Sequence, residues 1–317
     1  MKRQTLLLLA ITPLLGQAQI YDSDTLVTIA YWQEGETYHY KLDKYRYKEK
    51  NDEVTEASTT SFVRFFIAAE TDSNYLIEYA IDSIMFDGPY EDNPVLRTFA
   101  SEISTRLVYQ FETDPYGSFL QVVNWREVRE RIIGLWSDLE VVRSAAPDER
   151  RQMDQAIRLM TDSQEKIEAM LSREFAVLFE NYGYAFDTRD TTEYEQTLPN
   201  PYGETPFPKA GKIYFDTDSV VTRNSVTLYD ISAIDPGAGK QAIIQALKQI
   251  SSDSGSLDAE MEHVRFSVED RMTQEFSITN GALLRAEMQR EIIANDLNER
   301  NLRIDRQTWE LVRITME

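Results

Sequence analysis

Residues 124–183 decide the fold, and they read NWREVRERIIGLWSDLEVVRSAAPDERRQMDQAIRLMTDSQEKIEAMLSREFAVLFENYG. Apolar residues recur in this stretch every three or four positions, which is the spacing of an amphipathic helix. The sequence therefore predicts two consecutive helices, separated at Pro147 because proline fits the first turn of a helix. Asn124 is expected to cap the first helix, with Glu127 completing a capping box, and Gly183 to end the second.

Each predicted helix carries an apolar stripe that needs a covering surface. Because the regions on both sides read as strands, we expect the stripes to pack on a sheet. A second helix from Pro147 to Tyr182 would be about 54 Å long at 1.5 Å per residue, so we expect a bend or break near Ser172. The stripes consist of Trp125, Val128, Ile132, Trp136 and Leu139, and then of Met153, Ile157, Met160, Ile167, Leu171, Phe175, Leu178 and Tyr182.

Residues before the helices alternate between apolar and polar side chains, which is typical of β-strands. Tyr45 and Tyr47 continue the first strand on the opposite phase, which indicates a bulge. The polar residues 51–60 are expected to form a loop. The predicted strands are 38–47, 61–69, 75–81, and a hairpin formed by 105–112 and 118–123.

Residues after the helices begin with a passage in which four prolines lie between Leu198 and Pro208. Proline at that density suits neither a helix nor a strand, so we expect a connector over residues 184–211. Strands then resume, and the Asn280-Gly281 pair is a strong hairpin signal. The predicted strands are 212–215, 225–231, 264–268, 284–288 and 302–316, with a short helix around 243–250.

These elements predict an α+β protein with a meandering, curved antiparallel sheet in two halves, and a helical hairpin inserted mid-chain and packed on the sheet. The hairpins around Gly117 and Gly281 resemble each other, which fits two related halves, although glycine turns of this kind also arise by chance. The boundaries are 1–18 for a signal peptide and 19–317 for one domain, divided into 19–123 (first β half), 124–183 (helical hairpin), 184–211 (proline-rich connector) and 212–317 (second β half).

The first eighteen residues have the pattern of an export signal. Lys2 and Arg3 precede the apolar run 6–15, and Gly16-Gln17-Ala18 is a cleavage site of small residues. The run is too short to span a bilayer. Position 19 is Gln rather than the cysteine that a lipid anchor requires, so we expect a protein that is periplasmic or secreted and not lipid-anchored.

Composition excludes several functions. The chain has no cysteine, which excludes disulfides, thiol catalysis and thiolate metal sites. Its formal charge is −21, and loss of Lys2 and Arg3 would make it two units more negative. Such a surface repels nucleic acid. The charge is explained by solubility, or alternatively by a cationic partner or a divalent metal.

No complete catalytic signature occurs in the chain, so we assign no catalytic residue and no cofactor. His39 and His263 lie on polar faces of predicted strands, and no His-Glu-x-x-His or Gly-x-Ser-x-Gly segment occurs. Residues 235–241 lack the first glycine and the hydroxyl of a phosphate loop, so a turn that caps a helix explains them better. Ser163 and Lys166 have the spacing of penicillin-recognising enzymes without the companion segments.

Acidic residues gather in two predicted loops, where oxygen ligands suit calcium. Neither group follows the helix–loop–helix calcium pattern, and solvated loops are the simpler interpretation, so we predict no metal site. The two groups are Asp216 with Asp218, and Asp187 and Asp190 with Glu193.

Tyrosines on one face of the first β half are the remaining functional lead. Tyr38, Tyr40, Tyr75 and Tyr79 share a sheet face by alternation. An aromatic face of this kind suits an apolar ligand or a partner's strand or helix. The alternative is that the face packs under the helical hairpin.

The export signal, the long alternating strands and glycine-turn hairpins such as Asp114–Gly117 resemble the periplasmic lipoprotein-carrier group, whose members fold a strongly curved antiparallel sheet around helices and hold lipid within. The resemblance is architectural and transfers no functional residue. We expect a non-catalytic envelope protein that binds a hydrophobic ligand or a protein. The alternative is a carboxylate-dependent hydrolase, which requires two facing acids, one with a raised pKa, in a cleft.

Overall fold

The computed structural model describes residues 21–22, 24–88, 97–98, 101–102, 106–144, 146–198, 207–241, 244, 263–295 and 301–316. The predicted export signal and most of the predicted helix at 243–250 therefore lie outside the described residues. None of the helices in the described part of the chain has the length and hydropathy that a membrane-spanning helix requires.

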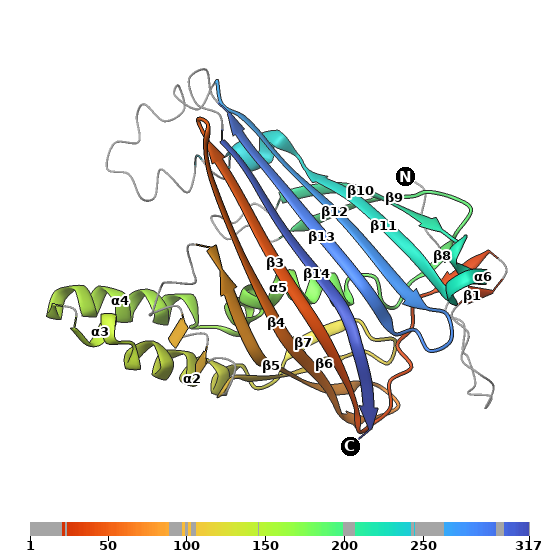
Figure 1. Cartoon of the computed structure of the whole chain (residues 1–317), viewed down its shortest axis with the longest axis horizontal. Helices are drawn as coiled ribbons and strands as arrows, with labels where there is room; N and C mark the ends of the chain where they lie inside the picture. The colour runs from red at the N-terminus through yellow and green to blue at the C-terminus, as the bar shows by residue number, and fades with distance from the viewer. Residues whose placement is uncertain are drawn as a thin grey trace.

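One large antiparallel sheet dominates the fold (Figure 1). Its order is β7-β6-β5-β4-β3-β14-β13-β12-β11-β10-β9, so each strand neighbours the next along the chain within each half. The two halves join where β3 pairs with β14 along nearly their whole length. The strands are β3 (Glu36–Lys50), β4 (Glu53–Glu70), β5 (Tyr75–Asp87), β6 (Val108–Thr113), β7 (Phe119–Val122), β9 (Thr192–Leu198), β10 (Phe207–Asp216), β11 (Ser225–Ile234), β12 (Arg265–Ser277), β13 (Leu283–Asn295) and β14 (Asn301–Met316).

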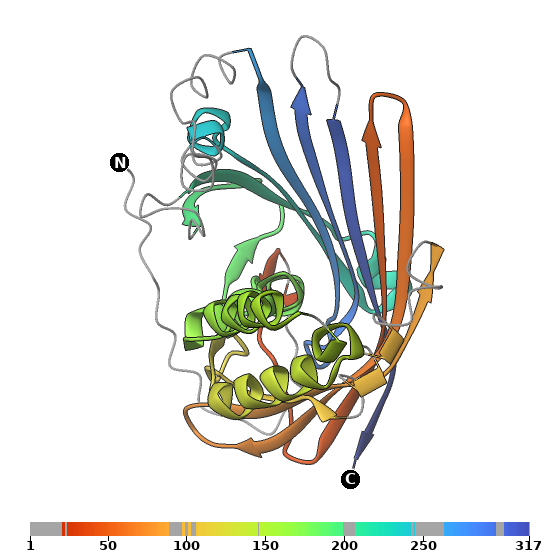
Figure 2. The same cartoon turned by 90° about the vertical axis from the view of Figure 1, so that its left-hand side faces the viewer.

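The predicted fold class is confirmed: a meandering antiparallel sheet in two halves carries helices inserted mid-chain. Helices α2 (Trp125–Asp138), α3 (Glu140–Ser144), α4 (Pro147–Met160) and α5 (Gln164–Phe179) connect the halves, and α6 (Ser219–Arg223) is a short turn in the second half. Figure 2 shows the sheet bent around the green helices, which lie against the lower part of its concave face. The β3–β14 seam, where the two halves of the sheet join, therefore forms part of the wall around the protein's interior.

Helix α5 supplies the centre of the core. Phe175 is buried and its ring lies 4.8 Å from that of Phe111 on β6 and 4.9 Å from that of Phe119 on β7. Leu178 is also buried. This is the packing predicted from the apolar stripe, because α5 is covered by strands from both halves. In α2, by contrast, Trp125 is only half-buried.

Two local predictions about the helices were wrong. The second helix breaks at residues 161–163 rather than near Ser172, because the Ser163 side chain accepts a hydrogen bond from Lys166 N and starts α5 anew. Asn124 precedes α2 but makes no capping bond. Its side-chain oxygen instead accepts from Gln110 N at 2.8 Å, and its amide donates to Val108 O at 3.0 Å. The amide thus anchors α2 to β6.

The β3–β4 hairpin corrects two further predictions. Asn51 and Asp52 both have positive φ (48° and 71°), which is the conformation of a two-residue type I′ turn. Only residues 51–52 of the expected loop over 51–60 form a turn, and residues 53–60 belong to strand β4. The β3–β4 register continues without a shift through Tyr45 and Tyr47, so the expected bulge is absent from this pairing. These tyrosines lie on the outer face of the sheet, opposite to Leu42.

The predicted connector over 184–211 also contains strands. It holds β8 (Ala185–Asp187), β9 and the start of β10, and Pro208 lies inside β10 opposite Thr197. Strand β8 pairs with β2 (Thr25–Val27), which pairs with β1 (Tyr21–Asp22), so the start of the described chain is tied to the residues that follow α5.

Candidate functional site

The four predicted face residues all lie in the core. Tyr38, Tyr40, Tyr75 and Tyr79 are 3%, 5%, 7% and 2% exposed. Tyr79 packs against Phe65 (5.0 Å between ring centroids) and against Phe175 of α5 (6.2 Å). Their packing under the helix is the simpler of the two interpretations given above. Binding of a ligand or partner by this face stays a prediction.

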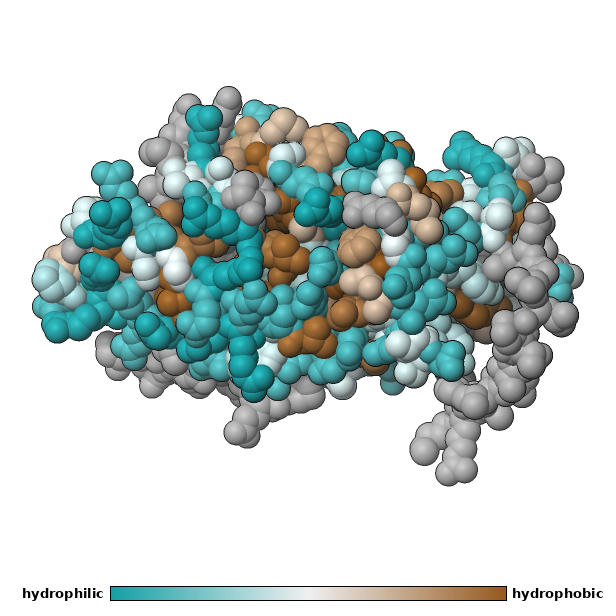
Figure 3. Space-filling model, turned by 90° about the horizontal axis from the view of Figure 1, so that it is seen from below, coloured by the Kyte–Doolittle hydropathy of each residue, from teal (hydrophilic) through white to brown (hydrophobic). Residues whose placement is uncertain are grey.

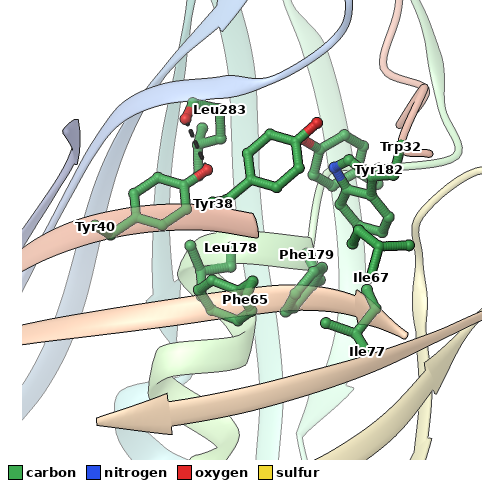
Figure 4. A pocket seen from close by; sticks show the side chains of 10 residues that line it. All are labelled: Trp32, Tyr38, Tyr40, Phe65, Ile67, Ile77, Leu178, Phe179, Tyr182 and Leu283. Carbon is green, nitrogen blue, oxygen red and sulfur yellow. Dashed lines mark hydrogen bonds between the residues drawn. The ribbon is translucent and has the colours of Figure 1, made fainter. Parts of the chain in front are cut away.

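A small apolar cavity lies where β3–β5 meet the end of α5 (Figure 4). Its volume is about 20 Å³, which is room for roughly one water molecule. The hydroxyls on its wall are engaged: Tyr40 donates to Leu283 O at 2.9 Å, and Tyr182 donates to Gly281 O at 2.8 Å. The lining residues are Trp32, Tyr38, Tyr40, Phe65, Ile67, Ile77, Leu178, Phe179, Tyr182 and Leu283.

One side of the cavity is closed by residues 28–35, which we call the strap. The strap has no regular secondary structure, and its Trp32 packs edge-on against Tyr75, Phe179 and Tyr182. Backbone bonds fix it on both sides: Thr28 N donates to Tyr184 O, and Ala30 N donates to Tyr116 O, both at 2.9 Å. The indole of Trp32 is thus a wall that belongs to a loop rather than to the sheet.

A second candidate site is a cluster of buried charges on the concave face of the second half. Asp230 on β11 is 4% exposed, and both of its carboxylate oxygens accept from the Tyr194 hydroxyl of β9, at 2.8 and 2.9 Å. The pKa of Asp230 is raised to about 6, mainly by burial and also by the nearby carboxylates of Glu180 and Asp270, whereas the hydrogen bond from Tyr194 and the charge of Lys209 oppose the shift. The pKa of Tyr194 is itself raised by burial.

The two nearby cations have other carboxylates as their partners. Arg290 on β13 makes a two-point ion pair with Asp270 on β12, at 2.6 and 2.7 Å. Lys209 on β10 is 3.7 Å from Glu180, the residue that ends α5. Of the cations in the described residues, none lies within ion-pair distance of Asp230. We call these five charged residues and Tyr194 the Asp230 cluster.

Tyr194 reaches Asp230 by crossing over Gly211, its register partner on β10. A Cβ atom at Gly211 would lie 2.6 Å from the tyrosine ring and 2.7 Å from the Cβ of Ser232, so only glycine fits there. The same residues border an open groove of about 620 Å³ over β9–β12. Its rim carries Glu193, Glu195, Glu269 and Lys212.

The remaining predicted residues have structural roles or stand apart. The Nε2 atom of His39 lies 3.3 Å from Thr315 Oγ1, and His263 is exposed. Asp235 accepts from Ala238 N at 2.8 Å, which is the expected helix-capping turn of residues 235–241. Ser163 is a helix cap.

Among the described residues, no group of three or more histidines and carboxylates could hold a metal ion. Asp187 is instead bonded to Arg189 at 2.7 Å, and this contact lowers its pKa to about 2. Asp216 accepts from Asp218 N at 2.9 Å, as in a turn.

Apolar residues also reach the surface. Tyr116, Leu120 and Tyr184 are 43%, 53% and 56% exposed. Seen from below, apolar side chains emerge in separate patches between polar ones (Figure 3). This face is therefore not one continuous apolar surface.

The Asp230 cluster was missed by sequence reasoning. Its members come from five strands and the end of one helix, and they are distant in the chain. One signal was readable: Val226, Leu228 and Asp230 alternate on one face of β11, so an acid follows two apolar residues on the same face. A carboxylate at such a position predicts a buried charge.

Comparison with known proteins identifies no family. No family model and no curated protein matches the chain. Among solved structures, one of lipovitellin, described as showing lipid–protein interactions, aligns with a TM-score of 0.45 and 10% identity. The alignment covers 90% of this chain and 26% of that one, so this chain spans about a quarter of that protein's length. A likeness this weak carries no argument about fold or function.

Proposed function

We propose that this chain is an exported, non-catalytic binding protein that holds a hydrophobic ligand between α5 and its curved sheet. The observation that supports this proposal is the apolar cavity between β3–β5, α5 and the strap. Because Tyr40 and Tyr182 already donate to backbone carbonyls, the wall offers a ligand mainly hydrocarbon. At about 20 Å³ the cavity admits no organic molecule, so binding requires Trp32 and the strap to move.

Export is part of the same proposal. The basic start, the apolar run and the cleavage site within residues 1–18 favour a protein of the periplasm or the exterior, and Gln19 argues against a lipid anchor. The closely packed interior also supports a second form of the proposal, in which the partner is a protein.

The test compares Trp32→Ala with Trp136→Ala, which removes the same side chain from α2. Organic extracts of protein purified without detergent are analysed by mass spectrometry, and N-phenyl-1-naphthylamine, a neutral fluorescent probe, is titrated into extracted protein. We expect a co-purifying hydrophobic compound and about tenfold tighter probe binding by Trp32→Ala, because an apolar cavity of roughly 150 Å³ suffices for a small aromatic ligand. An empty extract together with equal probe binding by both variants would leave only the protein-partner form.

A second candidate function is favoured by one observation, the raised pKa of Asp230 beside Glu180 and Asp270. These are the facing acids that a carboxylate-dependent hydrolase requires. The burial of Asp230 and its two bonds to Tyr194 oppose this role, since no substrate atom reaches the carboxylate in this arrangement. Hydrolysis of nitrophenyl glycosides by the wild type but not by Asp230→Asn would support it.

A further inference from the structure

The last turn of α5 faces both candidate sites. Leu178, Phe179 and Tyr182 point into the apolar cavity (Figure 4). Between them, Glu180 approaches Lys209, and Asn181 donates to Gln274 Oε1 at 2.7 Å. An electrostatic force on the Glu180 carboxylate therefore acts on the same turn of chain whose side chains line the cavity.

The Asp230 cluster carries one negative charge in excess. It contains three carboxylates and two cations, and each cation is paired with a carboxylate other than Asp230. Burial of Asp230 prevents water from screening that excess. A proton taken up by the Asp230 carboxylate, which stays beside the Tyr194 hydroxyl, would neutralise this excess.

The described residues that surround Asp230 come from the strands on both sides of β11 and from α5. Its register partners Ile213 and Met272 are apolar and buried, so the charged and titratable neighbours lie diagonally across the sheet or on α5. These neighbours are Tyr194 on β9, Lys209 on β10, Asp270 on β12 with Arg290 behind it on β13, and Glu180 at the end of α5.

We propose that a proton taken up by Asp230 packs the last turn of α5 onto the sheet and closes the apolar cavity, and that loss of this proton loosens the turn. The consequence for a ligand rests on the proposed function, whereas the movement of α5 requires no ligand. The proton acts by removing the repulsion between Asp230 and the carboxylate of Glu180, two residues after Leu178.

The direction with pH follows from the chemistry. Asp230 has a pKa of about 6, so it is mostly protonated at pH 5 and mostly ionised at pH 7.5. The turn is therefore packed at pH 5 and looser at pH 7.5. A hydrophobic ligand is retained in the acidic range and exchanges faster near neutrality.

Hydrogen exchange tests the movement without any ligand. The amides of Glu180 and Tyr182 are bonded to Ala176 O and Phe179 O, so their protection reports on the turn. We expect protection factors, corrected for the intrinsic effect of pH, to be about tenfold higher at pH 5 than at pH 7.5, since one pKa unit corresponds to a tenfold change. Asp230→Asn should keep the high value at both pH values.

The matched control is Glu193→Gln, which removes an exposed charge from the neighbouring edge strand and should keep the wild-type pH response. Equal protection at the two pH values in the wild type, or an unchanged response in Asp230→Asn, would overturn the inference. Release of N-phenyl-1-naphthylamine is measured on the same proteins. If the turn responds to pH but no probe binds, the hydrophobic-ligand form of the proposed function fails and the movement of α5 stands.

Discussion

The side-chain amide of Asn181 donates to Gln274 at 2.7 Å, and Gln274 in turn donates to Val177 O at 2.7 Å. Gln274 lies on β12 and is fully buried. The two bonds join the end of α5 to the second half of the sheet and satisfy polar groups that water does not reach.

Gln274→Ala should therefore lower the free energy of unfolding by about 2–4 kcal/mol, because it leaves the Asn181 amide and the Val177 carbonyl unpaired and creates a cavity. Urea denaturation followed by circular dichroism measures the change. Gln121→Ala, at an exposed position of β7, should cost less than about 0.5 kcal/mol. Similar losses in both variants would contradict the assigned role of Gln274.

Substitution by alanine should have opposite effects on stability at Gly211 and at Gly134. Gly211→Ala should destabilise the protein by about 1–3 kcal/mol, because the new methyl group overlaps Tyr194 and Ser232. Gly134 lies in α2 with nothing within 4 Å of its Cβ position. Gly134→Ala should stabilise by up to about 1 kcal/mol. Thermal denaturation of both variants checks the signs.

Phe175 should be among the costliest core residues to truncate. Its ring contacts Phe111, Phe119 and Tyr79, so Phe175→Ala should lose about 3–5 kcal/mol of stability. Met170→Ala removes a side chain from the exposed side of the same helix and should lose less than about 1 kcal/mol. A small loss for Phe175→Ala would mean that α5 does not pack in the sheet as described.

Asp230 makes stability depend on pH in an unusual direction for an acid. Its pKa is raised from 3.8 to about 6, so the folded state binds more protons than the unfolded state between these values. The contribution of Asp230 to the free energy of unfolding therefore falls as pH rises from about 4 to 7, by roughly 3 kcal/mol in total. Relative to wild type, Asp230→Asn should flatten this part of the stability profile. A parallel profile would show that Asp230 titrates normally.

Much of the architecture was predictable because it depends on local alternation. The strands of both halves and the packed stripe of α5 follow from periods of two and of three or four, which burial on one face imposes. Asn124 shows where such reasoning fails: its side chain could cap α2, but Gln110 N and Val108 O on β6 compete for it. That competition depends on tertiary structure.

The candidate sites were less predictable for the same reason. Tyr38 and Tyr40 were singled out for their chemistry, but the sequence does not show that α5 and the strap cover them. The partners of Asp230 become its neighbours only through the register of five strands, β9 to β13. Pro208 was wrongly expected to lie in a connector because proline lacks an N–H. Its carbonyl can still bond within a sheet, and it accepts from Asp235 N at 2.9 Å.

The seam between β3 and β14 has a consequence for how the chain acquires its shape. A ribosome completes β3 roughly 250 residues before the complementary strand emerges, so during synthesis the first hairpins present a long backbone edge with nothing to pair with. Contacts this remote in sequence form slowly, and unpaired edges invite aggregation. The sheet is thus completed late, and Lys44, Lys48 and Lys50 place positive charges along the edge of β3, which disfavours its pairing with another chain until β14 arrives.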